Sequence, residues 1–209
     1  MSSPDETRGT PRRGTRLLLA VAIGSLIQGA VALAPDADTR AGLSQSLRRY
    51  FPNVAMRTQD GKAVRFYDDM IKDKVVVIHL MFTGCSKFCS TITPNLVQVQ
   101  KQLRERVGNR ISMVSLTVDP ERDSPQVLRD YADQFHVKDG WNFLTGRKSD
   151  VDLIRRKLGV YDPDEKITEH MVVLTIGNER EGQWLSIPAL STTEDIVRTA
   201  VRIMEGKGG

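Results

Sequence analysis

The stretch with the strongest chemical potential is Phe82–Ser90, which contains both cysteines of the chain, Cys85 and Cys89. Three residues separate the two thiols, so on one helical turn they would occupy positions i and i+4 of the same face. Two sulfurs so placed can close a reversible disulfide or bind one soft metal ion between them. A chain of 209 residues can bury a core without a disulfide. We therefore predict that the pair serves a function rather than stapling the fold.

The elements that must position the cysteines can be predicted from periodicity. The apolar run Val75–Phe82 is rich in β-branched residues and indicates a central strand that ends at the cysteine loop. Before this strand we predict a hairpin of Val54–Arg57 and Ala63–Phe66 around Asp60-Gly61. After it we predict a helix from beyond Cys89 to Val107 with Pro94 near its start, a strand at Ile111–Thr117, a helix from Pro125 to about Phe135 capped by Ser124, and a helix over Val151–Leu158. The last predicted elements are a hairpin of Met171–Ile176 and Gln183–Ile187 around Gly177-Asn178 and a helix at Thr192–Met204. This order predicts an α/β, thioredoxin-like fold, with a central mixed sheet flanked by helices, an extra N-terminal β-hairpin and a helical insertion.

Two further side chains are expected at the same edge of the sheet. In an α/β sheet, sites gather where the carboxyl ends of the strands meet. Asp119 follows one predicted strand, and His170 comes directly before another. We predict that His170 joins the site, whereas Asp119 either caps its own loop or belongs to the site. His79, inside a strand, and His136, at a helix end, are predicted to be structural.

The donor set determines which metal would suit the site. Two thiolates and an imidazole form a soft three-coordinate set that suits Cu(I) and can also hold Cu(II). Zinc would ordinarily require a fourth protein ligand, and the chain has no third cysteine. Met81 and Met171 are soft donors by type, but methionines in apolar strands more often fill the core.

The first 34 residues have the layout of an export signal or a single membrane anchor. Four arginines precede an apolar run, Leu17–Ala34, which is at the lower limit of length for spanning a bilayer. The positive-inside rule then places the remainder outside the cytoplasm. We expect a polar tether at 35–50 and one folded domain at 51–209.

The charge excludes one class of partner. The chain has 30 basic and 26 acidic residues; residues 1–34 contain four arginines and two acids, so 26 and 24 remain, a net charge of +2. Because no basic cluster interleaved with aromatic residues is left, nucleic-acid binding is not expected.

Several ordered motifs together resemble the Sco/SenC family of thioredoxin-like copper chaperones, which are named for the synthesis of cytochrome c oxidase. The resemblance covers about Phe51 to the end of the chain and rests on Asp60-Gly61 with Tyr67-Asp68-Asp69, Phe82–Cys89, Thr117–Pro125, Trp141–Gly146, and His170 seven residues before Gly177. It implies that Cys85, Cys89 and His170 bind copper and that Asp119 lies near the metal and contributes to partner recognition. It also implies a protein that passes copper to the dinuclear copper site of an oxidase subunit. Together with the leader, it implies a location at the bacterial inner membrane facing the periplasm, or in the periplasm after signal cleavage.

The chain departs from the family pattern at two positions. The family usually has a proline after each cysteine, whereas this chain has Ser86 and Ser90. Proline fixes φ, so we expect the loop to be less rigid and the spacing of the sulfurs to differ. Lys87 adds a positive charge that favours the thiolate form.

Two functions remain open from the sequence. One is copper delivery to the oxidase subunit, and the other is thiol-disulfide exchange by Cys85 and Cys89 with a thiol reductant of the same compartment. Dedicated oxidoreductases of this fold carry a two-residue cysteine spacing and a proline where this chain has Glu169-His170. Both features are missing, which favours copper.

Overall fold

The structure, a computed structural model, describes Gly42 and residues 50–85, 89–164 and 173–206. Seven strands in this part of the chain form one mixed sheet in the order β2-β1-β5-β4-β3-β6-β7. The strands are β1 (Ala55–Thr58), β2 (Ala63–Arg65), β3 (Val75–Met81), β4 (Ile111–Thr117), β5 (Trp141–Gly146), β6 (Val173–Asn178) and β7 (Gln183–Pro188). Strands β5, β4 and β3 are parallel to one another, and β3 is an interior strand of the sheet that pairs parallel with β4 and antiparallel with β6.

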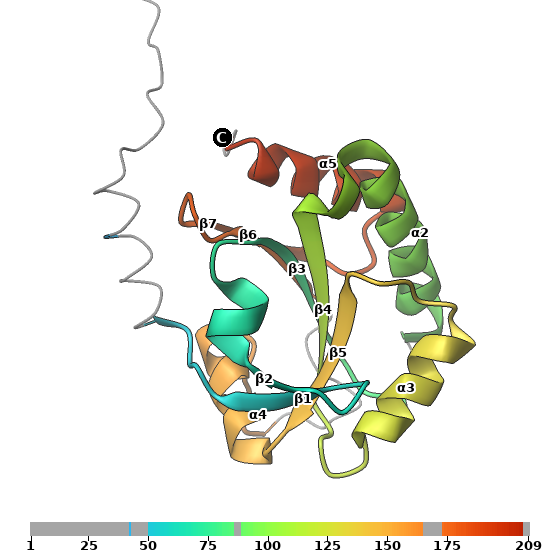
Figure 1. Ribbon diagram of the computed structural model, residues 1–209, viewed down its shortest axis with the longest axis vertical. Coiled ribbons are helices and arrows are strands. Elements are labelled where there is room, and N and C mark those ends of the chain that lie inside the picture. The colour runs from blue at the N-terminus through green and yellow to red at the C-terminus, as the bar shows by residue number, and fades with distance from the viewer. Residues whose placement is uncertain (1–41, 43–49, 86–88, 165–172, 207–209) are drawn as a thin grey trace, which may run out of the picture. The chain divides into compact units, whose positions relative to one another are not determined.

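Helices cover both faces of this sheet (Figure 1). They are η1 (Phe66–Ile71, π-helical), α2 (Cys89–Val107), η2 (Gly108–Arg110, 3₁₀), α3 (Pro125–Gln134), α4 (Lys148–Lys157) and α5 (Thr193–Met204). Helices α2, α3 and α5 pack on one face around Leu96, Leu128 and Ile196, and η1 and α4 pack on the other around Phe66 and Ile154. The sheet therefore separates two apolar cores, and all seven residues of β3 are buried between them.

The main elements agree with the predicted fold class. The hairpin of β1 and β2 turns at Asp60-Gly61, where Gly61 has a φ of 73°, and α3 begins after Ser124, whose side chain accepts a hydrogen bond from the Val127 N–H. His136 has a φ of 55°, and its N–H donates to the Asp133 carbonyl, so it ends α3 as predicted. The thioredoxin-like sheet, the N-terminal hairpin and the inserted helix α4 are thus confirmed.

Strand β5 is not among the elements predicted above. It pairs parallel with β4 and antiparallel with β1, so it joins the N-terminal hairpin to the central sheet. Helix η1 was likewise unpredicted. Its six residues bury four apolar side chains, including Tyr67, directly before β3. The Tyr67-Asp68-Asp69 motif therefore lies in the short helix η1, whose apolar side chains are buried.

The predicted turn of the second hairpin is wrong. Gly177 and Asn178 belong to β6, opposite Trp184 and Gln183, and the turn lies after them. Gly177 is required by packing rather than by turn geometry, because the Trp184 ring lies where a Cβ on residue 177 would be. Pro94 is also deeper in its helix than predicted: it is the sixth residue of α2 and offers no N–H to the carbonyl of Ser90.

The Trp184 packing leads to a prediction about stability. Gly177→Ala forces the added methyl group against the Trp184 ring and should cost about 1–3 kcal/mol in the free energy of unfolding. Gly146→Ala in β5 is the matched control, because its Cβ would lie 2.8 Å from the sulfur of Met56, the flexible end of a side chain. Urea denaturation of both variants checks this; an equal or smaller loss for Gly177→Ala would contradict the packing role.

Candidate metal and redox site

Cys85 lies in a tight turn immediately after the central strand. The chain leaves β3 at Met81, and the Cys85 N–H donates to the Phe82 carbonyl at 3.2 Å. The Cys85 side chain is half-buried and packs against both apolar cores. The thiol is therefore anchored on its inner side while solvent and partners can reach it.

Cys89 is the first residue of α2, and the segment 86–88 between the cysteines lies outside the described residues. One turn along α2, the Thr93 hydroxyl lies 2.7 Å from the Tyr131 hydroxyl of α3, and Thr93 is almost fully buried. This contact fixes the amino end of α2 against α3. A helix amino terminus carries partial positive charge and favours an anionic group there.

A buried carboxylate holds the loop that leads to Cys85. Asp123, 1% exposed, accepts hydrogen bonds from the N–H of Thr83, at 3.1 and 3.3 Å, and from its hydroxyl. The same carboxylate accepts a hydrogen bond from the hydroxyl of Thr117, the last residue of β4. We call Asp123, Thr83 and Thr117 the Asp123 network. It ties the cysteine loop after β3 to the loop after β4.

Asp119 lies in that second loop and is also largely buried. Its N–H donates to the Thr117 hydroxyl at 3.0 Å, and its carbonyl accepts from the N–H groups of Arg122 and Asp123. Its carboxylate pairs at 3.0 Å with Arg122, whose side chain is 80% exposed. The backbone of Asp119 thus forms the turn after β4, while its carboxylate pairs with the exposed guanidinium of Arg122.

The third predicted ligand, His170, lies outside the described residues. Strand β6 begins at Val173, and its next residue, Leu174, pairs with His79 of β3. The amino end of β6 is therefore at the carboxyl end of β3, the edge that carries the cysteine loop. Within the described part of the chain, no three His, Cys, Asp or Glu side chains are grouped so that they could hold a metal ion.

His79, in strand β3, is buried and held by a side-chain contact, as predicted for a structural histidine. His79 is 3% exposed, and its Nδ1 lies 3.5 Å from the Ser115 hydroxyl oxygen. That oxygen also accepts a hydrogen bond from Trp141 Nε1 at 2.9 Å. His79 therefore lies in the core beside Ser115 of β4, and its buried ring is not presented at the site edge.

Asp123 is the site residue that sequence reasoning missed. The motif Thr117–Pro125 contains two aspartates, and only Asp119 was singled out there. The available signal was the pair of threonines, Thr83 and Thr117, each at the end of a predicted strand. Hydroxyl groups at two adjacent strand ends can share one buried acceptor, but the sequence does not indicate which aspartate turns inward.

None of the helices in the described residues has both the length and the apolar character needed to cross a membrane. The predicted leader, 1–34, and nearly all of the tether lie outside these residues.

Loss of the Asp123 carboxylate should destabilise the domain. Asp123→Ala leaves the buried donors of Thr83 and Thr117 without their acceptor, so we expect the free energy of unfolding to fall by about 2–4 kcal/mol. Asp133→Asn, on the exposed side of α3, should change it by less than about 0.5 kcal/mol. In an Asp123→Ala background, Thr83→Val should cost little more. Additive losses in this double-mutant cycle would contradict the network.

Comparison with known proteins gives a consistent assignment. The model of the SCO1/SenC family matches residues 44–205. The SCO1 protein homolog of Bacillus subtilis is 36% identical over 92 residues, which are 43% of this chain and 46% of that protein. The chain spans about half the length of the first curated relatives it matches.

Two solved structures show the same architecture. Arabidopsis thaliana ScoI with copper bound aligns with a TM-score of 0.60 and 21% identity, covering 73% of this chain and 96% of that one. BsSco, described as a Sco-family cytochrome c oxidase assembly protein with a disulfide switch, aligns with a TM-score of 0.60 and 25% identity, covering 73% and 91%. The match of the family model over most of the folded domain shows that this chain belongs to the SCO1/SenC family.

Proposed function

We propose that this chain is a copper-binding assembly factor that delivers copper to the dinuclear copper site of a cytochrome oxidase subunit. Cys85, Cys89 and His170 are the proposed ligands, and Asp119 is the proposed contact for the recipient. Copper is therefore transported to another protein and is not a resident cofactor. The placement of Cys85 is the main support for this proposal. Cys85 is half-buried in the loop that follows β3, and hydrogen bonds through Asp123 join this loop to the loop that contains Asp119.

The chemistry of the residues fits this cargo. Thiolates are soft donors that favour Cu(I), and each thiol must lose its proton when the metal binds. A cysteine at the carboxyl end of β3 and another at the start of α2 can approach one ion from two elements. Entry of β6 at the same edge supports His170 as the third donor. Copper bound to the Arabidopsis relative adds support from the same fold.

The rival function is thiol-disulfide exchange by the same two cysteines. One thiolate would attack a disulfide of the substrate, and the second would resolve the mixed disulfide, leaving Cys85 and Cys89 oxidised. The disulfide switch described for BsSco favours keeping this alternative. Exchange alone assigns no role to His170, whereas copper binding does.

The proposed cellular location of the protein follows from residues 1–34. We propose that 1–34 exports or anchors the chain, that 35–50 is a tether, and that the folded domain faces the periplasm. In that compartment a dithiol stays available for copper only if a thiol reductant keeps it reduced. The proposed partners are therefore the oxidase subunit and such a reductant.

Copper titration separates the two functions. The reduced chain should bind one Cu(I) in competition with a chelator, and Cys85→Ser and Cys89→Ser should each weaken binding by more than about 100-fold because a thiolate ligand is lost. His170→Ala should weaken it by more than about tenfold. His136→Asn is the matched control, since asparagine tolerates the positive φ at that helix end.

An insulin-reduction assay on the same proteins provides the second readout. Copper delivery predicts slow or no turnover by the wild type. If His170→Ala kept full copper affinity while the wild type reduced insulin catalytically, the copper assignment would be wrong and the exchange function would replace it.

A further inference from the structure

A hollow lies over β6 and the edge strand β7, and its lining residue Thr175 pairs with Ile78 in the middle of β3. Its volume is about 310 Å³, close to the lower limit of about 300–1,000 Å³ for small-molecule sites. Trp184 of β7 lies opposite Gly177, which pairs with Val76 near the start of β3, whereas Cys85 follows the end of β3. The lining residues are Tyr50, Phe51, Lys157, Leu158, Thr175, Trp184, Leu185 and Ser186.

Aromatic and aliphatic side chains form the walls. The rings of Phe51 and Trp184 are 4.7 Å apart between centroids, and Tyr50 packs edge-on against Phe51 at 5.1 Å. The Trp184 ring can lie against the backbone of β6 because residue 177 has no side chain. Tyr50 and Leu185 are among the few large apolar residues that the described chain exposes. These walls suit a flat apolar body.

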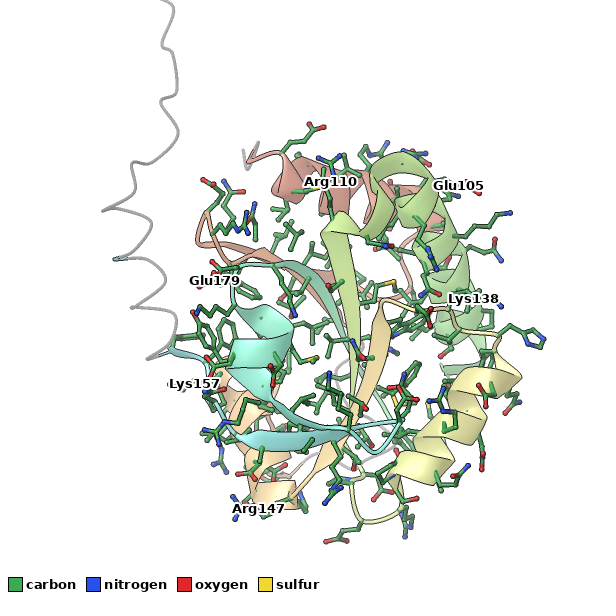
Figure 2. All side chains as sticks on the ribbon, viewed as in Figure 1. Glu105, Arg110, Lys138, Arg147, Lys157 and Glu179 are labelled. Atoms are coloured by element: carbon green, nitrogen blue, oxygen red, sulfur yellow. The ribbon has the colours of Figure 1, made fainter. Side chains whose placement is uncertain are left out.

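The polar side chains that line the hollow are two hydroxyls and one ammonium, besides the Tyr50 hydroxyl. Trp184 Nε1 has no partner among the described residues, but it is buried and so is not a contact for a bound molecule. The hydroxyls of Thr175 and Ser186 lie 3.3 Å apart, and the Lys157 ammonium lies 5.1 Å from the centre of the Tyr50 ring. The Tyr50 hydroxyl donates to the Lys157 carbonyl, which fixes this side of the rim, where Figure 2 labels Lys157. No lining residue is acidic.

We propose that this hollow binds a small amphipathic aromatic anion. Its rings would pack against Phe51 and Trp184, and its acidic head would accept a hydrogen bond from the hydroxyl pair of Thr175 and Ser186 and face the Lys157 ammonium. An uncharged aromatic molecule would gain the same apolar contacts without the charge. The site does not depend on the cysteines, so it stands whether or not the chain carries copper.

The test uses 8-anilinonaphthalene-1-sulfonate and its uncharged analogue N-phenyl-1-naphthylamine on the full chain. Calorimetry should show one sulfonate bound per chain and weaker binding of the analogue. Trp184 is one of only two tryptophans, and the other, Trp141, is 2% exposed in the core. Binding should therefore quench tryptophan emission, and Trp184→Phe should remove the larger part of the quenching, leaving only energy transfer from Trp141.

Three variants locate the site. Ser186→Phe places a ring in the hollow from an exposed edge-strand position and should weaken sulfonate binding by more than about tenfold. Gln126→Phe adds the same ring on the exposed surface of α3 and should leave binding unchanged. Lys157→Met should weaken binding by about threefold to tenfold and reduce the preference over the analogue.

Three results would overturn the proposal: absence of binding by the folded wild type, equal affinity in Ser186→Phe, or an analogue that binds as tightly as the sulfonate. Circular dichroism of each variant shows whether it is folded. If Ser186→Phe failed to fold, the reduced quenching in Trp184→Phe and the charge preference would still decide.

Discussion

The buried carboxylate of Asp123 is the constraint on which the geometry of the candidate site depends. A buried charge is costly unless hydrogen bonds compensate it, and this one receives them from the backbone and hydroxyl of Thr83 and from the hydroxyl of Thr117. Those donors lie at the ends of two neighbouring parallel strands. The bonds that stabilise the charge therefore also hold the two loops together, so stability and site geometry have the same origin.

The other end of the central strand is held in a similar way. Glu179 is fully buried, and its carboxylate accepts hydrogen bonds from the Tyr67 hydroxyl at 2.7 Å and from the Asp73 N–H at 2.9 Å. Its own N–H donates to the Lys74 carbonyl, one residue before β3. Two buried acids thus fix the entrance and the exit of β3. A cysteine placed directly beyond such a strand starts from a well-defined position even where the loop that follows lacks the family's prolines.

Much of the fold could be predicted because its signals are local. The β-branched run of β3, the Ser124-Pro125 start of α3 and the apolar stripe of α5 each identify their element. The failures involve contacts between two strands, which no single segment reveals. Gly177 resembles a turn residue until Trp184 is placed upon it. Strand β5 is a short segment that is recognised as a strand only through its pairing with β1 and β4.

The ligand types of the site can be proposed from the sequence, whereas the residues that support it cannot. Cysteine and histidine chemistry can be inferred from residue identity and spacing, so Cys85, Cys89 and His170 could be proposed as a set. The inward turn of Asp123 depends on the three-dimensional meeting of two loops, and no local pattern distinguishes it from Asp119. Tyr67 likewise belongs to a motif of the resemblance, yet its contact is with a buried glutamate 112 positions along the chain.

X-ray absorption at the copper edge of the Cu(I)-loaded chain tests the central claim most directly, because it counts the donor atoms around the metal. We expect a shell of two sulfurs and one nitrogen in the wild type, with the nitrogen lost in His170→Ala and one sulfur lost in Cys85→Ser. A shell of oxygen and nitrogen donors, or a sulfur count unchanged in Cys85→Ser, would contradict the proposed ligand set.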